Sequence, residues 1–301
     1  MGRIADTRDL HIIEEDVGIL VGSDRTNTSL YGGGISLEAT PATFEQLPHL
    51  LEMSMKTATA TSDSADVFTY TYTIPTTTTQ ALKPYVWQGG DNVQAEALNF
   101  VHCLDWTLSG EGGKEWMMSA NLFGKQVVNN NFTALSTLIS VNEMNFSQTK
   151  LYIDDDSNSW GTTLMSNTLL SASIKYNAKL VGVPTADGQL TWSFVKTPKP
   201  DITMTITFEH DSQSVLEKTD WRNETPRLIR LKNEGLAFTN PSSTYPYRTT
   251  IIDLAGKWLK FNPLGKKNGN NVYEGAFTVR YNSTQASAGQ ILIANARTSL
   301  G

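Results

Sequence analysis

The sequence has little of what secreted and membrane proteins need. Of its 301 residues only Cys103 is a cysteine, so no disulfide can form within the chain. No apolar run approaches the roughly 20 residues of a membrane-spanning helix. The N-terminus carries charges at Arg3, Asp6, Arg8 and Asp9 where a signal peptide would be apolar. The sequence therefore predicts a soluble, non-secreted protein with no membrane partner.

Clustered positive charge is also missing. The chain has 24 Lys and Arg against 30 Asp and Glu, which gives a net charge of −6 at pH 7. Proteins that hold nucleic acid tightly through its phosphates carry patches of Lys and Arg. The acidic balance argues against such a clamp and predicts weak repulsion from nucleic acid.

The motifs of common enzymes and metal sites are absent as well. The four histidines are scattered, and no HExxH, Walker loop, GxGxxG or GxSxG sequence occurs. Asp154, Asp156 and Asn158 resemble the first ligands of a calcium loop. However, Ser159 replaces the turn glycine, and Met165 stands where a bidentate Glu belongs. We interpret the segment as an acidic turn and predict no catalytic residue, cofactor or metal.

What the sequence does contain is a stretch, residues 98–124, with the pattern of a long β-hairpin. Apolar and polar residues alternate to residue 109, a glycine-rich turn follows at 110–113, and the alternation then resumes. Each arm has roughly 11 residues, against about 5 to 6 for an average strand. A strand of that length needs a partner along its edge, from the same chain or from a neighbouring copy.

The alternation predicts which side chains of the first arm are buried. One face would carry Leu98, Phe100, His102, Leu104, Trp106 and Leu108. On this pattern His102 is a core histidine, and Cys103 beside Val101 is a buried thiol.

Two helices are predicted outside the hairpin. Thr40 followed by Pro41 is a typical helix start, and an apolar stripe at helical spacing comes after it. Pro48 falls inside this stripe, so the helix either kinks there or begins there. A second helix is expected over residues 211–223.

The order of elements occurs twice. A strand, a helix and the hairpin at 98–124 in the first half match a strand, the helix at 211–223 and a last hairpin at 272–295. A Leu-Val-Gly triplet at 20–22 recurs at 180–182. Because identities are few and the offset drifts from about 160 to about 178, chance likeness of two β-rich segments is the alternative to a duplication.

This succession resembles the tail tube (major tail) proteins of long-tailed, siphovirus-type bacteriophages, over most of the chain and without a strict motif. The resemblance is carried by the polar arm into residues 18–22, the helix start at Thr40 and Pro41, the hairpin at 98–124, segment 171–192 and segment 228–235. It implies β-sandwiches with a flanking helix, whose long hairpins join into a closed barrel. Rings of such barrels stack into a hollow tube through which the genome passes.

The expected fold is therefore mainly β, with two tandem tail-tube-like β-sandwich domains that share one barrel. The predicted divisions are an N-terminal arm at 1–17, a first domain at 18–150 and a second domain at 151–301. If a ring has six sectors, two domains per chain give a trimer with pseudo-sixfold shape. The alternative is a six-chain ring in which the second half decorates the outside.

The function implied is that of a structural virion protein without enzyme activity. Its partners would be copies of itself, the tape measure, terminator and distal tail proteins, and DNA that passes without specific binding. The expected location is the virion tail, after assembly in the bacterial cytoplasm. A decoration or baseplate protein, or remotely a carbohydrate-active β-enzyme, are the alternatives.

Particular residues are assigned to these roles. The carboxylates expected near the lumen are Asp105, Glu115 and Glu274. The expected contacts between rings are the polar loops at 57–66 and 76–94 and, in the N-terminal arm, Arg3, Asp6, Arg8 and Asp9.

Overall fold

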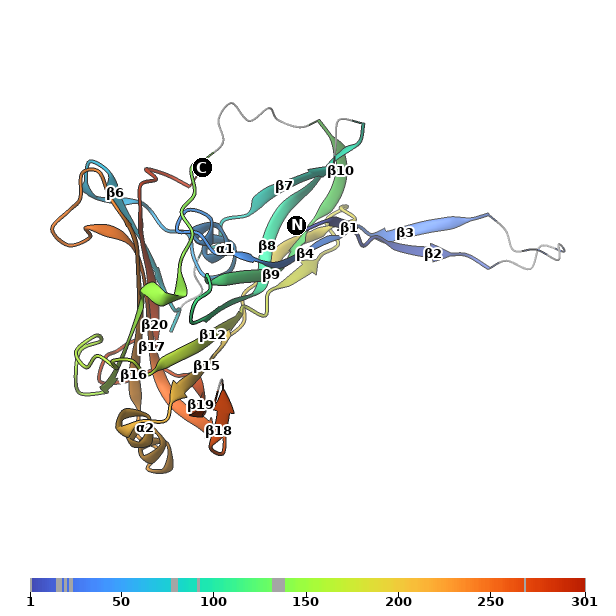
Figure 1. Ribbon diagram of the computed structural model, residues 1–301. Coiled ribbons are helices and arrows are strands. Elements are labelled where there is room, and N and C mark those ends of the chain that lie inside the picture. The colour runs from blue at the N-terminus through green and yellow to red at the C-terminus, as the bar shows by residue number, and fades with distance from the viewer. Residues whose placement is uncertain are drawn as a thin grey trace.

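The computed structural model describes the chain except residues 1, 15–17, 19–20, 22–23, 77–80, 91–92, 132–138, 268 and 301. The described part is dominated by antiparallel β-strands, with two α-helices beside them (Figure 1). The mainly β class predicted from the sequence is confirmed. Among the described residues, no helix is both long and apolar enough to cross a membrane.

Most strands belong to one large sheet that does not close on itself. Its strands, in order across the sheet, are β1 (Ile4–Asp6), β4 (Gly33–Pro41), β9 (Met117–Gly124), β8 (Ala95–Glu111), β12 (Leu169–Asn177), β15 (Asp201–Glu209), β19 (Asn270–Val279), β17 (Tyr247–Phe261), β20 (Gly289–Asn295), β6 (Val67–Thr73) and β5 (Thr61–Ser64). Further pairings add β7 (Tyr85–Gly90) and β10 (Gln126–Asn130) to β8, β16 (Arg227–Ala237) to β17, β11 (Thr149–Asp155) to β16 and β18 (Gly265–Lys267) to β19. The short 3₁₀ helix η1 (Phe146–Gln148) precedes β11.

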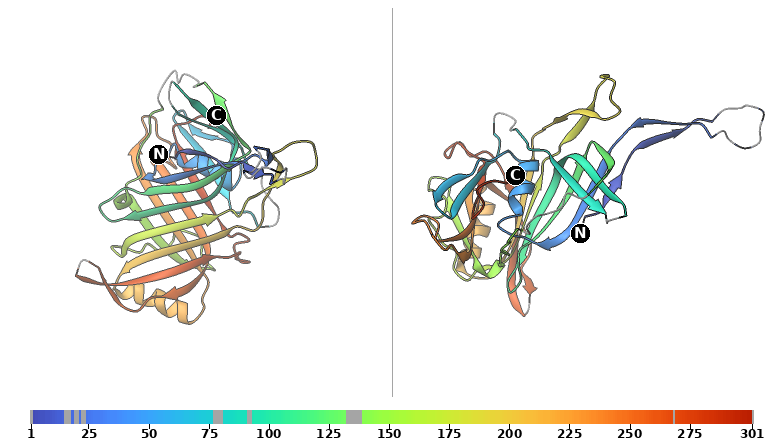
Figure 2. Two further views of the ribbon diagram at one scale, coloured as in Figure 1. Left: turned by 90° about the vertical axis from the view of Figure 1, so that its right-hand side faces the viewer. Right: turned by 90° about the horizontal axis from the view of Figure 1, so that it is seen from above.

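Two separate two-stranded arms extend from this sheet. The first consists of β2 (Asp9–Ile12) and β3 (Thr26–Leu30), and the second of β13 (Val181–Pro184) and β14 (Trp192–Lys196). Both arms project beyond the body of the sheet (Figure 2, right). The base of the first arm contacts the turn of the second, because the backbone N–H of Tyr31, just after β3, donates to the carbonyl of Leu190, between β13 and β14, at 2.6 Å.

The long strands β8 and β17 run through two layers of the molecule. Figure 2, left, shows the row of strands from β9 to β19 crossing in front of the strands of the β16, β17 and β20 group. The N-terminal part of β8 pairs with β7 and β10, and its C-terminal part pairs with β9 and β12. One continuous core of buried apolar residues fills the interior and draws on both halves of the chain.

The first helix, α1 (Leu47–Ser54), begins later than Thr40 and Pro41 suggest. Thr40 and Pro41 instead end β4 and pair with Met118 and Met117 of β9. Pro48 lies in the first turn of α1, where its missing N–H costs no hydrogen bond. Of the two alternatives that Pro48 left open, a helix that begins there is the one observed.

The second helix, α2 (Ser212–Arg222), matches its predicted range closely. The Asp211 side chain caps it by accepting the backbone N–H of Ser214 at 2.8 Å. The Ser214 hydroxyl returns a contact to the backbone N–H of Asp211 at 3.0 Å, which completes a capping box.

The hairpin predicted at 98–124 is present as β8 and β9, but its strict alternation is wrong in the middle. Phe100 has a φ of 54° and is half exposed, whereas Val101 and Cys103 are fully buried. The pairing also shifts register between Cys103 and Asp105. These irregularities lie where β8 passes from one layer to the other, so alternation returns only at Trp106. The predicted burial of the Cys103 thiol is confirmed, and that burial raises its pKa.

The last hairpin, predicted over 272–295, does not form. β19 and β20 do not pair with each other, because β17 lies between them in the sheet. β17 is long enough to pair with β20 through residues 249–254 and with β19 through residues 256–261. The hairpin that corresponds to β8 and β9 is therefore β17 and β19.

The same strand order occurs twice across the sheet. We call β1, β4, β9 and β8 unit 1, and β12, β15, β19 and β17 unit 2. In each unit an arm lies between the first two strands in the sequence, and a helix follows the second. The units are joined edge to edge by the antiparallel pairing of β8 with β12. The domain limits at residues 17 and 150 stay predictions, because one sheet and one core run through both halves.

Candidate functional surface: the polar face of the sheet

Beyond residue 105 of β8, the central strands have one apolar face and one polar face. Trp106 and Leu108 are buried, as are Ile174 on β12 and Met204 on β15. The residues between them face the other way and stand side by side across the sheet. This polar face consists of Asp105, Thr107, Ser109 and Glu111 on β8, Ser171, Ser173 and Lys175 on β12, Thr203, Thr205 and Thr207 on β15, and Glu274, Ala276 and Thr278 on β19.

Small hydroxyl side chains dominate the polar face, and a shallow hollow of about 450 Å³ lies on it. Glu115, in the turn between β8 and β9, and Glu274 both line this hollow. The Glu274 carboxylate accepts a hydrogen bond from the Asn262 side chain at 2.6 Å. The face also carries Lys175, and Lys114 and Lys267 line the hollow, so amines and hydroxyls lie beside the carboxylates.

Asp105 lies on the same face but does not line the hollow. Its carboxylate accepts a hydrogen bond from the Asn121 side chain of β9 at 3.0 Å. The structure therefore brings Glu115 and Glu274 together and leaves Asp105 farther along β8. Whether any of the three faces a channel stays a prediction.

A charged cluster at the edge of the hollow was missed from the sequence. Glu111 accepts hydrogen bonds from Lys114 and Lys267, each at 2.7 Å. These two bonds lower the pKa of Glu111 to about 2. The spacing of Glu111 and Lys114 was a visible signal for one pair. No local pattern marks Lys267, which tertiary pairing of β18 with β19 brings in.

The four N-terminal residues assigned to ring contacts lie in different surroundings. Arg3 is exposed just before β1, whereas Asp6 ends β1 and accepts hydrogen bonds from the backbone N–H and the guanidinium of Arg8. The guanidinium lowers the pKa of Asp6. Asp9 begins the first arm and accepts the Ser29 hydroxyl at 2.9 Å. Part of the segment predicted as a free arm is thus a strand of the main sheet.

The loops assigned to ring contacts are only partly irregular. Residues 57–66 include strand β5, and residues 76–94 include strand β7, while positions 77–80 and 91–92 lie outside the described residues. Both arms expose apolar side chains at Leu10, Ile12, Val181 and Phe194. Exposed apolar groups on projecting elements are typical of contact surfaces.

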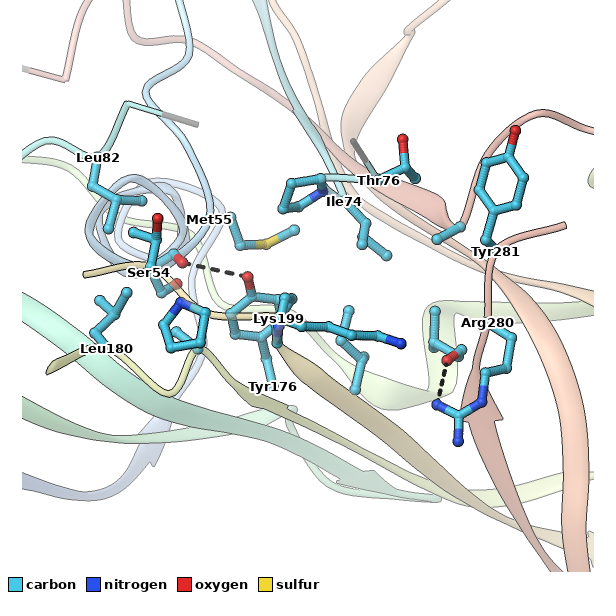
Figure 3. Close-up of a pocket in the computed structure, with 18 residues that line it drawn as sticks. Ser54, Met55, Ile74, Thr76, Leu82, Tyr176, Leu180, Lys199, Arg280 and Tyr281 are labelled. Carbon is cyan, nitrogen blue, oxygen red and sulfur yellow. Dashed lines mark hydrogen bonds between the residues drawn. The ribbon is translucent and has the colours of Figure 1, made fainter. Parts of the chain in front are cut away.

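Another pocket, on a different part of the molecule, has a different character. It holds about 370 Å³ between the end of α1, the segment 197–200 and the loop at Tyr281 (Figure 3). At its floor the Tyr176 hydroxyl donates to the carbonyl of Ser54 at 3.3 Å, while Lys199 and Arg280 stand to one side. No Asp, Glu, His or Cys is among the described residues that line it, so it offers no general acid or base of those types.

The acidic turn and the core histidine predicted from the sequence both have structural roles. Asp154 is buried and accepts the backbone N–H groups of Gly161, Thr162 and Thr163, so it holds the loop after β11. His102 is buried, and this burial lowers its pKa, so the ring is neutral near pH 7. Across the described ranges, no group of three or more His, Cys, Asp or Glu side chains is arranged to hold a metal ion.

Comparison with known proteins does not assign the chain to a family. No protein-family model matches the chain, and no curated protein matches it significantly.

Proposed function

We propose that the protein is a structural virion protein that polymerises into the tail tube of a long-tailed bacteriophage. Copies join side by side into rings, and the rings stack into a hollow tube through which the genome passes. The observation that carries the proposal is the edge-to-edge joining of two similar four-stranded units, through β8 and β12. A sheet built from repeated units with pairable edges extends by adding further copies.

The polar face is proposed to line the channel. Its apolar counterpart, with Trp106 and Leu108, is already buried in the core, whereas the Ser- and Thr-rich side is partly exposed, apart from the buried Thr207 and Thr278. Asp105, Glu115 and Glu274 add negative charge to a chain whose net charge is −6. Such a surface repels DNA weakly, so that DNA slides past without specific binding.

Three chains per ring is the proposed stoichiometry. Unit 2 repeats the strand order, the arm and the flanking helix of unit 1. A decoration on the outside of a six-chain ring needs none of these, whereas a second tube-forming domain needs all of them. The hairpins around the bore then alternate between β8 with β9 and β17 with β19.

The two arms are proposed to contact the next ring. They project from the sheet with exposed apolar residues, and Arg8 and Asp9 lie at the base of the first arm. The other partners proposed are the tape measure, terminator and distal tail proteins. The proposed location is the virion tail, with assembly in the bacterial cytoplasm.

Negative-stain electron microscopy of the purified protein at high concentration tests the function. Hollow tubes of uniform width, with three chains per ring in a reconstruction, are the expected result. A true sixfold ring would overturn the stoichiometry alone. Protein that stays monomeric under all conditions, or that hydrolyses polysaccharide until a single Asp or Glu is replaced, would overturn the tube function.

A further inference from the structure

We infer that the exposed edge of β17, residues 257–261, binds strand β1 of a second copy of this chain, antiparallel and with Ile4 opposite Trp258. The inference rests on the proposed function and specifies its lateral contact by edge, partner strand and register.

The template for this contact lies within the chain. β12, the first strand of unit 2, pairs antiparallel with β8, the last strand of unit 1, over residues 171–177 and 105–111. In this junction Tyr176 stands opposite Trp106. Their rings are stacked, with centroids 5.4 Å apart and planes inclined by 5°. The pairing of β8 with β12 therefore shows how the last strand of one unit binds the first strand of the next unit.

Trp258 holds in unit 2 the position that Trp106 holds in unit 1. Trp106 pairs with Ala120 of β9, which in turn pairs with Leu37 of β4. The corresponding row of unit 2 runs from Trp258 through Phe277 of β19 to Met204 of β15, and this row is likewise buried.

Counted from these two rows, Ile4 holds in unit 1 the position that Tyr176 holds in unit 2. Tyr176 pairs with Ile202, two residues before Met204, and Ile4 pairs with Ile35, two residues before Leu37. If the internal junction repeats between copies, Ile4 of the second copy comes opposite Trp258. Its neighbour Ala5 comes opposite Lys257, as Asn177 comes opposite Asp105 within the chain.

Both edges required for this contact are open. β16 pairs with β17 only as far as Gly256, and no strand of the described chain pairs with that side of β17 beyond it. Among the described strands, β1 pairs with β4 alone and ends the sheet. Unpaired backbone groups on such edges are templates for another strand.

The side chains of the β17 edge also fit a partner that arrives only on assembly. Leu259 is 59% exposed and lies where the pairing of β17 with β19 shifts register, between Trp258 and Lys260. Lys257 and Lys260 flank it and are exposed, and lysines on an edge keep a free chain from pairing indiscriminately.

The β1 strand that binds the open edge of β17 has to come from a second copy of the chain. β1 begins the strand order of unit 1 and β17 ends that of unit 2, with six strands between them in the sheet. A strand that leaves one end and binds the other end of the next molecule makes a head-to-tail contact. Contacts of this kind close into a ring when the rotation allows it.

An engineered disulfide tests the contact and its register. The pair Ala5→Cys and Lys257→Cys places two exposed positions directly opposite each other, where Cα atoms of antiparallel strands are about 4.5–5.5 Å apart. That distance lies in the range that a disulfide spans. Native Cys103 is buried, so it does not compete.

Oxidised assemblies of the Ala5→Cys, Lys257→Cys protein are expected to give a ladder of covalent oligomers that ends at the closed ring, three chains in the proposed stoichiometry. The matched control, Arg3→Cys with Lys257→Cys, moves the partner cysteine two residues along the same strand. We expect at least tenfold less cross-linking from it.

The outcomes separate this inference from the proposed function. If tubes form but the 5–257 pair does not cross-link, the edge assignment is wrong and the tube function stands. If the 3–257 pair cross-links better, the register is wrong. If the wild-type protein forms no tubes in any condition, the proposed function itself fails.

Discussion

Trp106 and Trp258 each donate an indole N–H to the helix that covers their unit. Trp106 donates to the Ser54 hydroxyl at the end of α1, at 3.1 Å, and Trp258 donates to the Glu217 carboxylate within α2, at 3.0 Å. The geometry is shared, but the acceptor is a hydroxyl in unit 1 and a carboxyl group paired with Arg227 in unit 2. The carboxylate of Glu217 is also held by Arg227, through its Nε at 3.2 Å and its Nη2.

This difference predicts unequal costs when the acceptors are removed. Glu217→Ala leaves Arg227 mostly buried without its main partner, and loss of one member of a buried ion pair costs about 3–5 kcal/mol. Ser54→Ala, the matched variant, removes two neutral hydrogen bonds, one accepted from Trp106 and one donated to the Leu50 carbonyl, and should cost about 1–3 kcal/mol. Urea unfolding of the two variants checks the order. Equal losses of stability would show that the ion pair between Glu217 and Arg227 does not stabilise unit 2.

The Asp211 cap of α2 predicts a pH-dependent contribution to stability. Burial opposes ionisation of Asp211, but hydrogen bonds from Thr168 and Ser214 outweigh it and lower its pKa below the ordinary 3.8. Since the folded pKa is the lower one, the stabilisation is present above about pH 3.8 and is lost as the pH falls through the folded pKa.

Asp211→Ala should therefore cost about 1 kcal/mol at pH 7 and progressively less as the pH falls below about 3.8. Asp211→Asn keeps an N-cap acceptor, so it should retain most of the stability at pH 7 without the acid-dependent part. Thermal unfolding at several pH values is the measurement. A difference between wild type and Asp211→Ala that does not change with pH would contradict the assigned role of the carboxylate.

Charge reversal on the polar face should affect DNA passage more than folding. Replacing Asp105, Glu115 and Glu274 together by Lys changes partly exposed positions, where single substitutions usually cost within about 0.5 kcal/mol. Positive side chains in the bore would hold DNA, so ejection should slow while tails assemble. Infectivity and DNA-release assays on phage carrying the variant are the test.

The control for that experiment is an equal charge change away from the polar face, with Asp63, Asp156 and Glu224 replaced by Lys. These residues lie in β5, after β11 and after α2. Normal ejection by phage with the Asp105, Glu115 and Glu274 variant, or equal impairment by the control, would count against a lumen-facing polar face.

Two deletions separate contacts within a ring from contacts between rings. Removing residues 2–15 takes away β1 and strand β2 of the first arm, and the protein should stay folded and soluble but fail to polymerise. Replacing residues 9–30 by a short glycine linker keeps β1 and should leave rings that do not stack. The ends of this deletion are close, because the N–H of Thr7 donates to the carbonyl of Gly32 at 3.1 Å.

Electron microscopy and sedimentation distinguish free chains, rings and tubes for both deletions. Normal tubes from the 9–30 variant would remove the first arm from any role between rings. Normal tubes from the 2–15 variant would also exclude the pairing of β1 with β17.

Local signals in the sequence were sufficient for several elements. The range 211–223 predicted for the second helix matches α2, and the glycine-rich turn between alternating segments placed β8 and β9. The burial of Cys103 and Trp106 also followed from their neighbours. In each case the information lies within one or two turns of chain, where propensity, capping and side-chain alternation act directly.

Only the tertiary structure decided which strands meet. The alternation of residues 272–295 is compatible with a hairpin, yet β17 intervenes because it offers a longer edge to both strands. Tertiary structure also decided the charged cluster at the hollow, since Lys267 pairs with Glu111 from 156 positions away in sequence. Strand pairing is non-local, and one apolar and polar pattern suits many partners. The choice among them depends on which edges and faces the whole fold leaves to be covered.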